Sequence, residues 1–194
     1  MANYFGVGYQ FLNLTRESIN EMVKQGNHTL LFSDPTPNDD DSWAKYEERT
    51  RWNDFNIGVP ILFNFYHGLE LILKAIIKEL DIELKKKNHN LNALLDLLKN
   101  LNNSELKKII EIFDIHLSNK SPFYDFFEQN GGTANNYYEM LKYPESKANK
   151  SFRFSEIRGN ENEGLRRFLI IKQSTIELKE AIAEWMRNRN KNSA

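Results

Sequence analysis

The sequence predicts an all-α protein built around one central helix. Between Gly58 and Asp81 the polar residues recur every three or four positions, and nearly every other residue is apolar. A helix that meets water along so narrow a stripe must be enclosed by other helices. At 194 residues, 40% of them hydrophobic, the chain is long enough to bury a substantial core. We therefore expect an up-and-down helical bundle with additional short helices.

Charge and composition exclude several classes of function. The formal net charge is −1, so no general positive field favours nucleic acid or a membrane surface. The absence of cysteine excludes disulfides, thiolate catalysis and cysteine-ligated zinc, and it is compatible with the cytoplasm. Asn64, His67 and Glu70 interrupt the apolar run of the central helix, so we expect neither a signal peptide nor a membrane span. We expect a cytoplasmic protein with no cofactor and no membrane partner.

The N-terminal part is expected to hold one helix and an acidic loop. Over residues 4–14 the apolar residues fit either a strand or a helix, so this conformation stays open. Thr15 is a candidate N-cap and Gly26 a candidate stop, which predicts a helix between them. Residues 33–41 contain two prolines and consecutive aspartates, which predict a solvated loop. The aspartates lack the alternating ligands of a calcium loop.

The next part is expected to hold the central bundle. Ser42 can cap a helix that leads, continuously or through a bend near Gly58, into the central helix. Pro60 fits the first turn of that helix, where its missing N–H is tolerated. The basic stretch 85–90 is expected to end the helix, and Asn90 can cap the leucine-rich helix that follows.

Further short helices follow, each with a start signal of its own. Ser104 can begin an isoleucine-rich helix, and Ser121 with Pro122 can begin a short aromatic helix. Gly131 and the glycine after it can end that helix, and Thr133 can cap the next turn.

The C-terminal part is expected to be a loop and a closing helix. Residues 143–160 show little periodicity and predict a loop with an extended piece at 152–154. Over residues 161–190 apolar side chains recur every three or four positions, as in a helix. The basic residues at the end of this segment suit the C-terminus of a helix. We expect one domain over 1–194, divided into 1–41, 42–142, 143–160 and 161–190.

The polar stripe on the central helix is the first candidate site. Glu70 and Lys74 are four residues apart with the acid first, which favours a surface ion pair of about 0.2–0.5 kcal/mol. In the alternative interpretation, Asn64 and His67 join them to line a polar groove or a subunit interface. Such a groove could bind a nucleotide or another small ligand.

Other kinds of chemistry lack their motifs. None of the four histidines follows a glutamate by three positions, as a di-iron bundle requires. The chain has no G-x-S-x-G nucleophile elbow, and the segment 131–133 lacks the Lys of a P-loop. We expect no metal site, and the catalytic residues, if any, are unknown.

The chain from Gly68 to Leu98 resembles HEPN domains. The family has a helix with Glu-x-x-x-Lys in an apolar run, then His-x-Leu and a leucine-rich helix, and often an aromatic-Tyr-Pro segment later. The matching residues here are Glu70, Lys74, His89, Leu91, Tyr137, Tyr138 and the run from Leu141 to Pro144. Lys142 stands where the family often has an Arg.

The resemblance implies an all-α up-and-down bundle of HEPN type, often a homodimer. Such proteins serve prokaryotic toxin-antitoxin, abortive-infection and other defence or stress systems, where an antitoxin or another protein is the partner and many members cut RNA. The ribonucleases carry an Arg, four to six residues and then a His near the start of the last helix. Arg166 and Arg167 stand near that place, but Lys172 and Gln173 occupy their partner positions. Because cleavage without metal needs groups that exchange protons near neutral pH, we expect a binding or interaction module without this activity.

Two alternatives to that interpretation stay open. In an atypical endoribonuclease, Arg166 or Arg167 would position the phosphate, and His67 or His89 would transfer protons. In the second alternative, the stripe from Asn64 to Lys74 would bind a nucleotide or another small ligand. A local cationic patch could also bind RNA or a nucleotide beside nearby aromatic rings, although the plainer interpretation is a solvated face. The residues of this candidate patch are Arg153, Arg158, Arg166, Arg167 and Lys172.

Overall fold

The computed structural model describes residues 3–28, 40–83, 89–158 and 163–192, and these are mainly helical. The helices are α1 (Tyr4–Lys24), α2 (Asp40–Thr50), α3 (Asp54–Glu79), α4 (Leu91–Lys99), α5 (Lys107–Leu117), α6 (Tyr124–Gln129), α7 (Tyr137–Met140) and α8 (Glu163–Asn192). Three short 3-10 helices, η1 (Ser104–Leu106), η2 (Ala134–Asn136) and η3 (Phe154–Ile157), connect them. Within the described residues no strand forms, and one isolated bridge joins Glu145 to Ser151. The predicted all-α class is confirmed.

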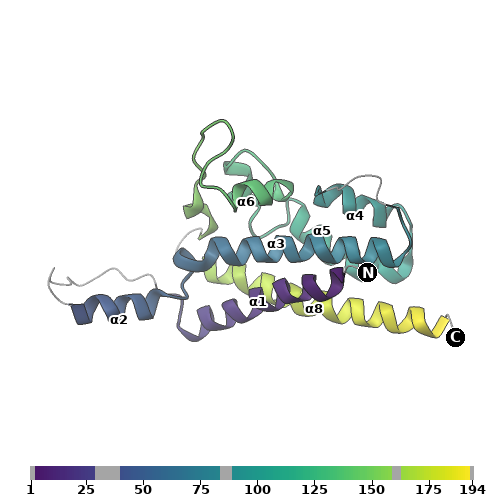
Figure 1. Ribbon diagram of the computed structural model, residues 1–194, viewed down its shortest axis with the longest axis horizontal. Coiled ribbons are helices and arrows are strands. Elements are labelled where there is room, and N and C mark those ends of the chain that lie inside the picture. The colour runs from purple at the N-terminus through teal and green to yellow at the C-terminus, as the bar shows by residue number, and fades with distance from the viewer. Residues whose placement is uncertain (1–2, 29–39, 84–88, 159–162, 193–194) are drawn as a thin grey trace.

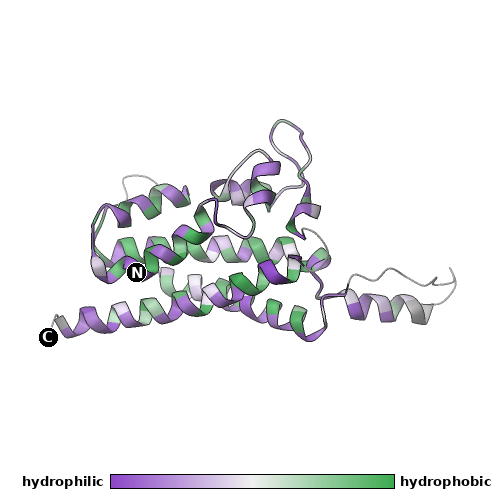
Figure 2. Ribbon diagram, turned by 180° about the vertical axis from the view of Figure 1, so that it is seen from behind, coloured by the Kyte–Doolittle hydropathy of each residue, from purple (hydrophilic) through white to green (hydrophobic). Residues whose placement is uncertain are grey.

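The helix α3 lies in the middle of the molecule (Figure 1). Helices α1 and α8 cover one side of it, α4, α5 and α6 lie on the other, and α2 projects away from the bundle. The buried apolar side chains form one continuous cluster, to which α3 contributes nine residues. Apolar residues are frequent along α3, whereas the far end of α8 is mostly hydrophilic (Figure 2). The prediction that the middle of the chain is an enclosed helix is confirmed.

The start of α3 differs from the prediction. The Asn53 side chain caps the helix by accepting a hydrogen bond from the Asn56 N–H at 2.9 Å. Pro60 therefore lies in the second turn, and the expectation that it occupies the first turn is wrong. The break between α2 and α3 falls at residues 51–53, and Gly58 lies inside α3. Asn53 is a strong capping residue, which the pattern of apolar residues gave no reason to choose.

The helix α2 begins before its expected cap. Its first residue is Asp40, so Ser42 lies inside the helix and does not cap it. Of the acidic loop expected over residues 33–41, the part up to residue 39 lies outside the described residues. The expected break at 85–90 lies largely outside them too, but α3 has already ended at Glu79.

The undecided N-terminal stretch is helical. Asn3 caps α1 by accepting from the Gly6 N–H at 2.8 Å. The expectation that Thr15 is an N-cap is wrong: it is buried within the helix, where its hydroxyl donates to the Phe11 carbonyl at 3.0 Å. The predicted stop is confirmed, because Gly26 adopts φ +80°, which suits a residue without Cβ.

Helices α1 and α3 approach closely where two glycines face the partner helix. A Cβ at Gly68 would lie 2.8 Å from Leu12 Cδ2, and a Cβ at Gly8 would lie 2.9 Å from Ile72 Cδ1. Real Cβ atoms do not approach other atoms so closely, so a larger residue at either position would have to displace the Leu12 or Ile72 side chain or move the helices apart. This contact fixes α1 against the half of α3 that carries the polar stripe.

Several predicted caps are confirmed around the shorter helices. Asn90 caps α4 by accepting from the Ala93 N–H at 2.9 Å. Thr133 caps η2 in a reciprocal capping box, and Gly131 ends the preceding turn at φ +77°. One expectation needs correction, because Asn103 rather than Ser104 is the cap that begins η1.

The C-terminal part follows the prediction with local differences. The loop expected over residues 143–160 contains η3, so the extended piece expected at 152–154 ends where that 3-10 helix begins at Phe154. Helix α8 is described from Glu163 to Asn192. The expected start of the closing helix at 161 lies outside the described residues.

Among the described residues, the stretch Trp43–Glu79, which covers most of α2 and all of α3, is long and apolar enough by length and composition to cross a membrane. In this fold 67% of its most apolar window is buried inside the protein, as in the core helix of a bundle.

Candidate functional site

The candidate site is a cluster of side chains around the carboxylate of Glu70, whose side chain is only 2% exposed. The Lys74 Nζ lies 2.5 Å from Oε1 of Glu70, and the His89 Nδ1 lies 2.8 Å from the same oxygen. The Tyr137 hydroxyl donates a short hydrogen bond to Oε2. We call these four residues the Glu70 cluster. It satisfies both oxygens of a buried carboxylate with polar partners, as a charge removed from water requires.

The fold brings the Glu70 cluster together from three parts of the chain. Glu70 and Lys74 are one turn apart on α3, and His89 precedes the Asn90 cap of α4. Tyr137 is the first residue of α7, directly after the Thr-capped η2. The interpretation of Glu70 and Lys74 as a surface ion pair is wrong, because their side chains are 2% and 12% exposed.

The partners of Glu70 set its charge state. Burial acts to raise the pKa of the Glu70 carboxyl, but hydrogen bonds from Lys74, Tyr137 and His89 and the charge of Lys74 outweigh it and lower this pKa below its ordinary value. Burial and the hydrogen bond to Glu70 both raise the pKa of the Tyr137 phenol. The carboxylate is therefore ionised and the phenol is neutral near neutral pH.

His67 lies at the edge of the cluster. Its Nδ1 is 3.3 Å from the Tyr137 hydroxyl oxygen, and its ring stacks on Phe63 and meets Phe11 edge-on. Burial lowers the pKa of the His67 imidazole. The predicted stripe is thus an assembled polar seam, with Asn64 half-buried one turn before His67.

His89 is the member of the cluster that meets solvent, since its side chain is 65% exposed. An ionised carboxylate can only accept a hydrogen bond, so Nδ1 of His89 carries the hydrogen toward Glu70. In the neutral ring Nε2 is then the acceptor, the arrangement used where an imidazole must take up a proton. The Lys74 ammonium, by contrast, points to Glu70. This orientation weakens the expectation of a nucleotide site that depends on Lys74.

Two arginines of the predicted cationic patch are held by carboxylates. Arg167 is 6% exposed, and its guanidinium contacts Glu163 at 2.8 Å and Asp125 at 3.3 Å. The Nε of Arg158 lies 3.0 Å from Oδ1 of the buried Asp54. Both guanidinium groups join segments of the fold, so the structure does not offer them to a phosphate.

The other patch residues remain at the surface. Arg153 and Arg166 are exposed and Lys172 is half-exposed. In the described part of the chain, neither His67 nor His89 contacts an arginine, and the cation beside His89 is Lys74. The structure therefore separates the histidines and arginines that the ribonuclease alternative would bring together.

Sequence reasoning missed the role of Tyr137 and the exposed group after it. The hydroxyl of Tyr137 completes the Glu70 cluster, whereas the sequence indicated only an aromatic segment. The Lys142 Nζ lies over the exposed rings of Tyr138 and Tyr143, at 4.6 and 5.4 Å from their centroids. The sequence does contain one signal for this group: Tyr138 is four residues before Lys142, and Tyr143 follows it directly.

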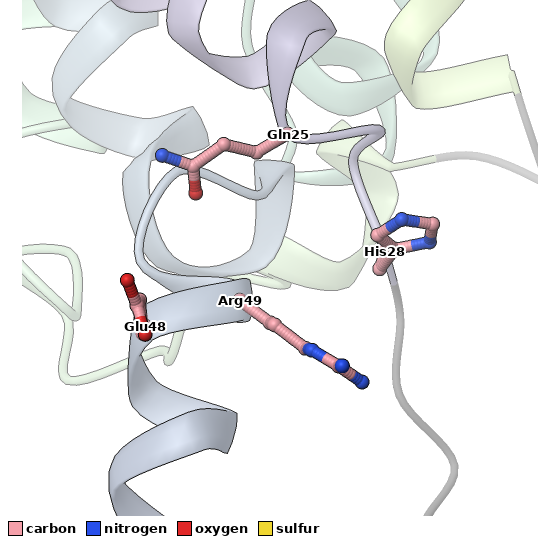
Figure 3. A pocket seen from close by; sticks show the side chains of 4 residues that line it. All are labelled: Gln25, His28, Glu48 and Arg49. Carbon is pink, nitrogen blue, oxygen red and sulfur yellow. The ribbon is translucent and has the colours of Figure 1, made fainter.

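A separate cavity of about 790 Å³ opens between the end of α1 and α2 (Figure 3). Gln25, His28, Glu48 and Arg49 line it, and it is broadly open to solvent. None of these lining residues belongs to α3 or to the Glu70 cluster. Among the described residues, no group of three or more potential ligand side chains could hold a metal ion.

Comparisons with protein-family models, with curated proteins and with solved structures found no match.

Proposed function

We propose that this chain is a HEPN-like helical bundle that binds RNA without cutting it, as a non-catalytic module of a prokaryotic defence, toxin-antitoxin or stress system. The observation that carries the proposal is the convergence on Glu70. Lys74, His89 and Tyr137 belong to the separate stretches that carry the resemblance, and all three contact this one carboxylate. Lys74 would lie beside Glu70 on any helix, but His89 and Tyr137 come from separate stretches, and their contact with the same carboxylate supports the resemblance.

The expected lack of cleavage rests on the last helix. Helix α8 contains no histidine, and the buried Arg167 is bound to carboxylates. The usual pairing of Arg and His at this place has no counterpart. As in the family it resembles, we propose a homodimer with an antitoxin or another protein as a further partner.

A cleavage and binding assay tests this function. Purified protein is incubated with total RNA, and the products are separated on native and denaturing gels. We expect retarded but intact RNA, with retardation that weakens as salt is raised, because phosphate contacts release counterions. Specific fragments would contradict the non-catalytic part. Free, uncut RNA at high protein concentration would contradict the binding part.

One observation favours a second candidate, an atypical metal-independent endoribonuclease. His89 is exposed, and Glu70 holds its Nδ1, which suits proton transfer from Nε2. This candidate predicts fragments from the wild type that His89→Ala abolishes, while His28→Ala, at an exposed histidine elsewhere, leaves them unchanged. Fragments that survive His89→Ala would exclude His89 as the proton-transfer group.

A further inference from the structure

Beside the Glu70 cluster lies a second group of exposed side chains, formed by Tyr138, Lys142 and Tyr143. Tyr138 is on α7, and the other two follow in the turn after it. The two tyrosines are 43% and 49% exposed, whereas most of the described aromatic side chains are buried or half-buried. We call these three residues the tyrosine platform.

Lys142 links the two rings of the platform. Its Nζ lies over both rings and donates a hydrogen bond to the Tyr138 hydroxyl at 2.9 Å. This hydrogen bond raises the pKa of the Lys142 ammonium, so the side chain is cationic at neutral pH. Because the side chain is exposed, its long stem can move the charge from the rings to a bound anion.

The rings beneath the platform hold it in place. Tyr138 meets Tyr137 edge-on with centroids 6.2 Å apart, and it lies 6.1 Å from the ring of Phe63. Phe63 in turn stacks on His67 at 5.8 Å. Tyr137 is anchored by Glu70, so the platform stands on the same support as the candidate site.

Platform and cluster are joined below the surface. Tyr137, which is fully buried, belongs to the cluster and contacts Tyr138 of the platform, and the exposed His89 contacts Glu70 on the cluster side. The Glu70 carboxylate is buried among its partners, so it presents little negative charge to the surface. Exposed rings beside a mobile cation are the features that bind unpaired bases and their phosphates.

We propose that the tyrosine platform is a stacking site for single-stranded RNA, with one base on Tyr138, another on Tyr143 and a neighbouring phosphate on Lys142. This inference rests on the proposed RNA-binding function and assigns its surface. The bases of a duplex are stacked on one another and cannot reach the rings, so single strands are the ligand. Stacking on a ring depends little on base identity, so the site tolerates many sequences.

The test measures the binding of a fluorescein-labelled single-stranded RNA of about 12 nucleotides by anisotropy. Tyr138→Ala and Tyr143→Ala should each weaken binding about tenfold, and Tyr138→Phe, which keeps the ring, should restore most of it. Lys142→Ala should make the RNA affinity depend less steeply on salt concentration, by the amount expected for the loss of about one phosphate contact. Phe55→Ala is the matched control, because Phe55 is 68% exposed with Arg158 5.8 Å from its ring, and it lies eight residues before Phe63 on α3.

Each outcome has a separate meaning. If the wild type binds RNA and both Tyr→Ala variants bind equally well, the platform is overturned while the proposed function stands. A loss of the same size in the Phe55→Ala control, or equal binding of a duplex, also overturns it. Displacement of the oligonucleotide by AMP at the same concentration would identify a free nucleotide as the ligand instead. If the wild type binds no RNA, both the platform and the proposed binding function fail.

Discussion

The Nδ1 of His89 lies 2.8 Å from Oε1 of Glu70, although 19 residues separate them in the sequence. This contact joins the segment before α4 to the middle of α3. With Lys74 and Tyr137 it ties three parts of the fold to one buried carboxylate. The candidate site is therefore also a structural link, and changes to it should affect stability as well as binding.

Glu70→Ala should lower the free energy of unfolding by about 3–5 kcal/mol, because it leaves the ammonium of Lys74 buried without its partner. Urea denaturation followed by circular dichroism measures this change. Replacing both charges, with Glu70→Leu and Lys74→Met together, should recover part of the loss.

The surface pair of Glu21 and Lys24 is the matched control for this experiment. The two side chains are 38% and 74% exposed and 3.5 Å apart. Glu21→Ala should change the free energy of unfolding by less than about 0.5 kcal/mol. An equally small effect of Glu70→Ala would show that the buried link contributes nothing to the fold.

Gly68→Ala should destabilise the protein by about 1–2 kcal/mol, because the new Cβ would lie 2.8 Å from Leu12 Cδ2 and force α1 away from α3. Gly58→Ala is the comparison within the same helix, where the nearest side-chain atoms lie at 3.3 Å. There the gain in helix propensity should roughly offset the crowding. Thermal denaturation of both variants should separate them; equal midpoints would mean that the helices adjust freely.

Asp54→Ala should destabilise the protein by about 2–3 kcal/mol. Its fully buried carboxylate accepts a hydrogen bond from Asn27 at 3.1 Å and attracts the Arg158 guanidinium. The Arg158 contact lacks hydrogen-bond geometry, so its contribution is charge attraction, reduced because Arg158 is 26% exposed. Arg158→Ala should therefore have a smaller effect in urea denaturation. The reverse order would contradict this assignment.

The central helix and most short helices could be predicted because their signals are local. Asn90, Thr133 and Gly131 act within one turn, where a side chain or a positive φ satisfies backbone groups. The start of α1 could not be found in this way. Its buried face includes Gly8 and Thr15, which no apolar pattern marks, because close contact with α3 selects small residues there.

Glu70 and Lys74 were predicted as candidate site residues, but the role of Tyr137 and the arrangement of the site were not. The spacing of Glu70 and Lys74 is the same for a surface pair and a buried one. Helix α7 and the segment before α4 pack over Glu70 and bury it. The spacing of residues within α3 carries no information about these later segments. For the same reason, the alternative in which Arg166 or Arg167 positions a phosphate could not take into account that Glu163 and Asp125 hold Arg167.

We expect the buried His116 to make the protein less stable in mild acid. The imidazole is fully buried against Phe65, and neither ring nitrogen has a hydrogen-bond partner in the described structure. Burial lowers the pKa of His116 from 6.5 to about 3. Between these two values the unfolded chain binds a proton that the folded protein does not, so stability falls as the pH drops below 6.5. The lowered pKa of Glu70 makes stability depend on pH only below pH 4.5, the ordinary pKa of a glutamate.

His116→Leu, which keeps the site apolar and of similar size, should remove this pH dependence. From pH 7.5 to pH 5 the wild type should lose about 2 kcal/mol of unfolding free energy through this residue, at about 1.4 kcal/mol per unit below 6.5. Half-buried His67 adds a smaller loss of the same sign, which the variant retains. Urea titrations at both pH values measure the difference, with His28→Leu as the exposed control. A variant that loses as much stability as the wild type would show that His116 can be protonated within the fold.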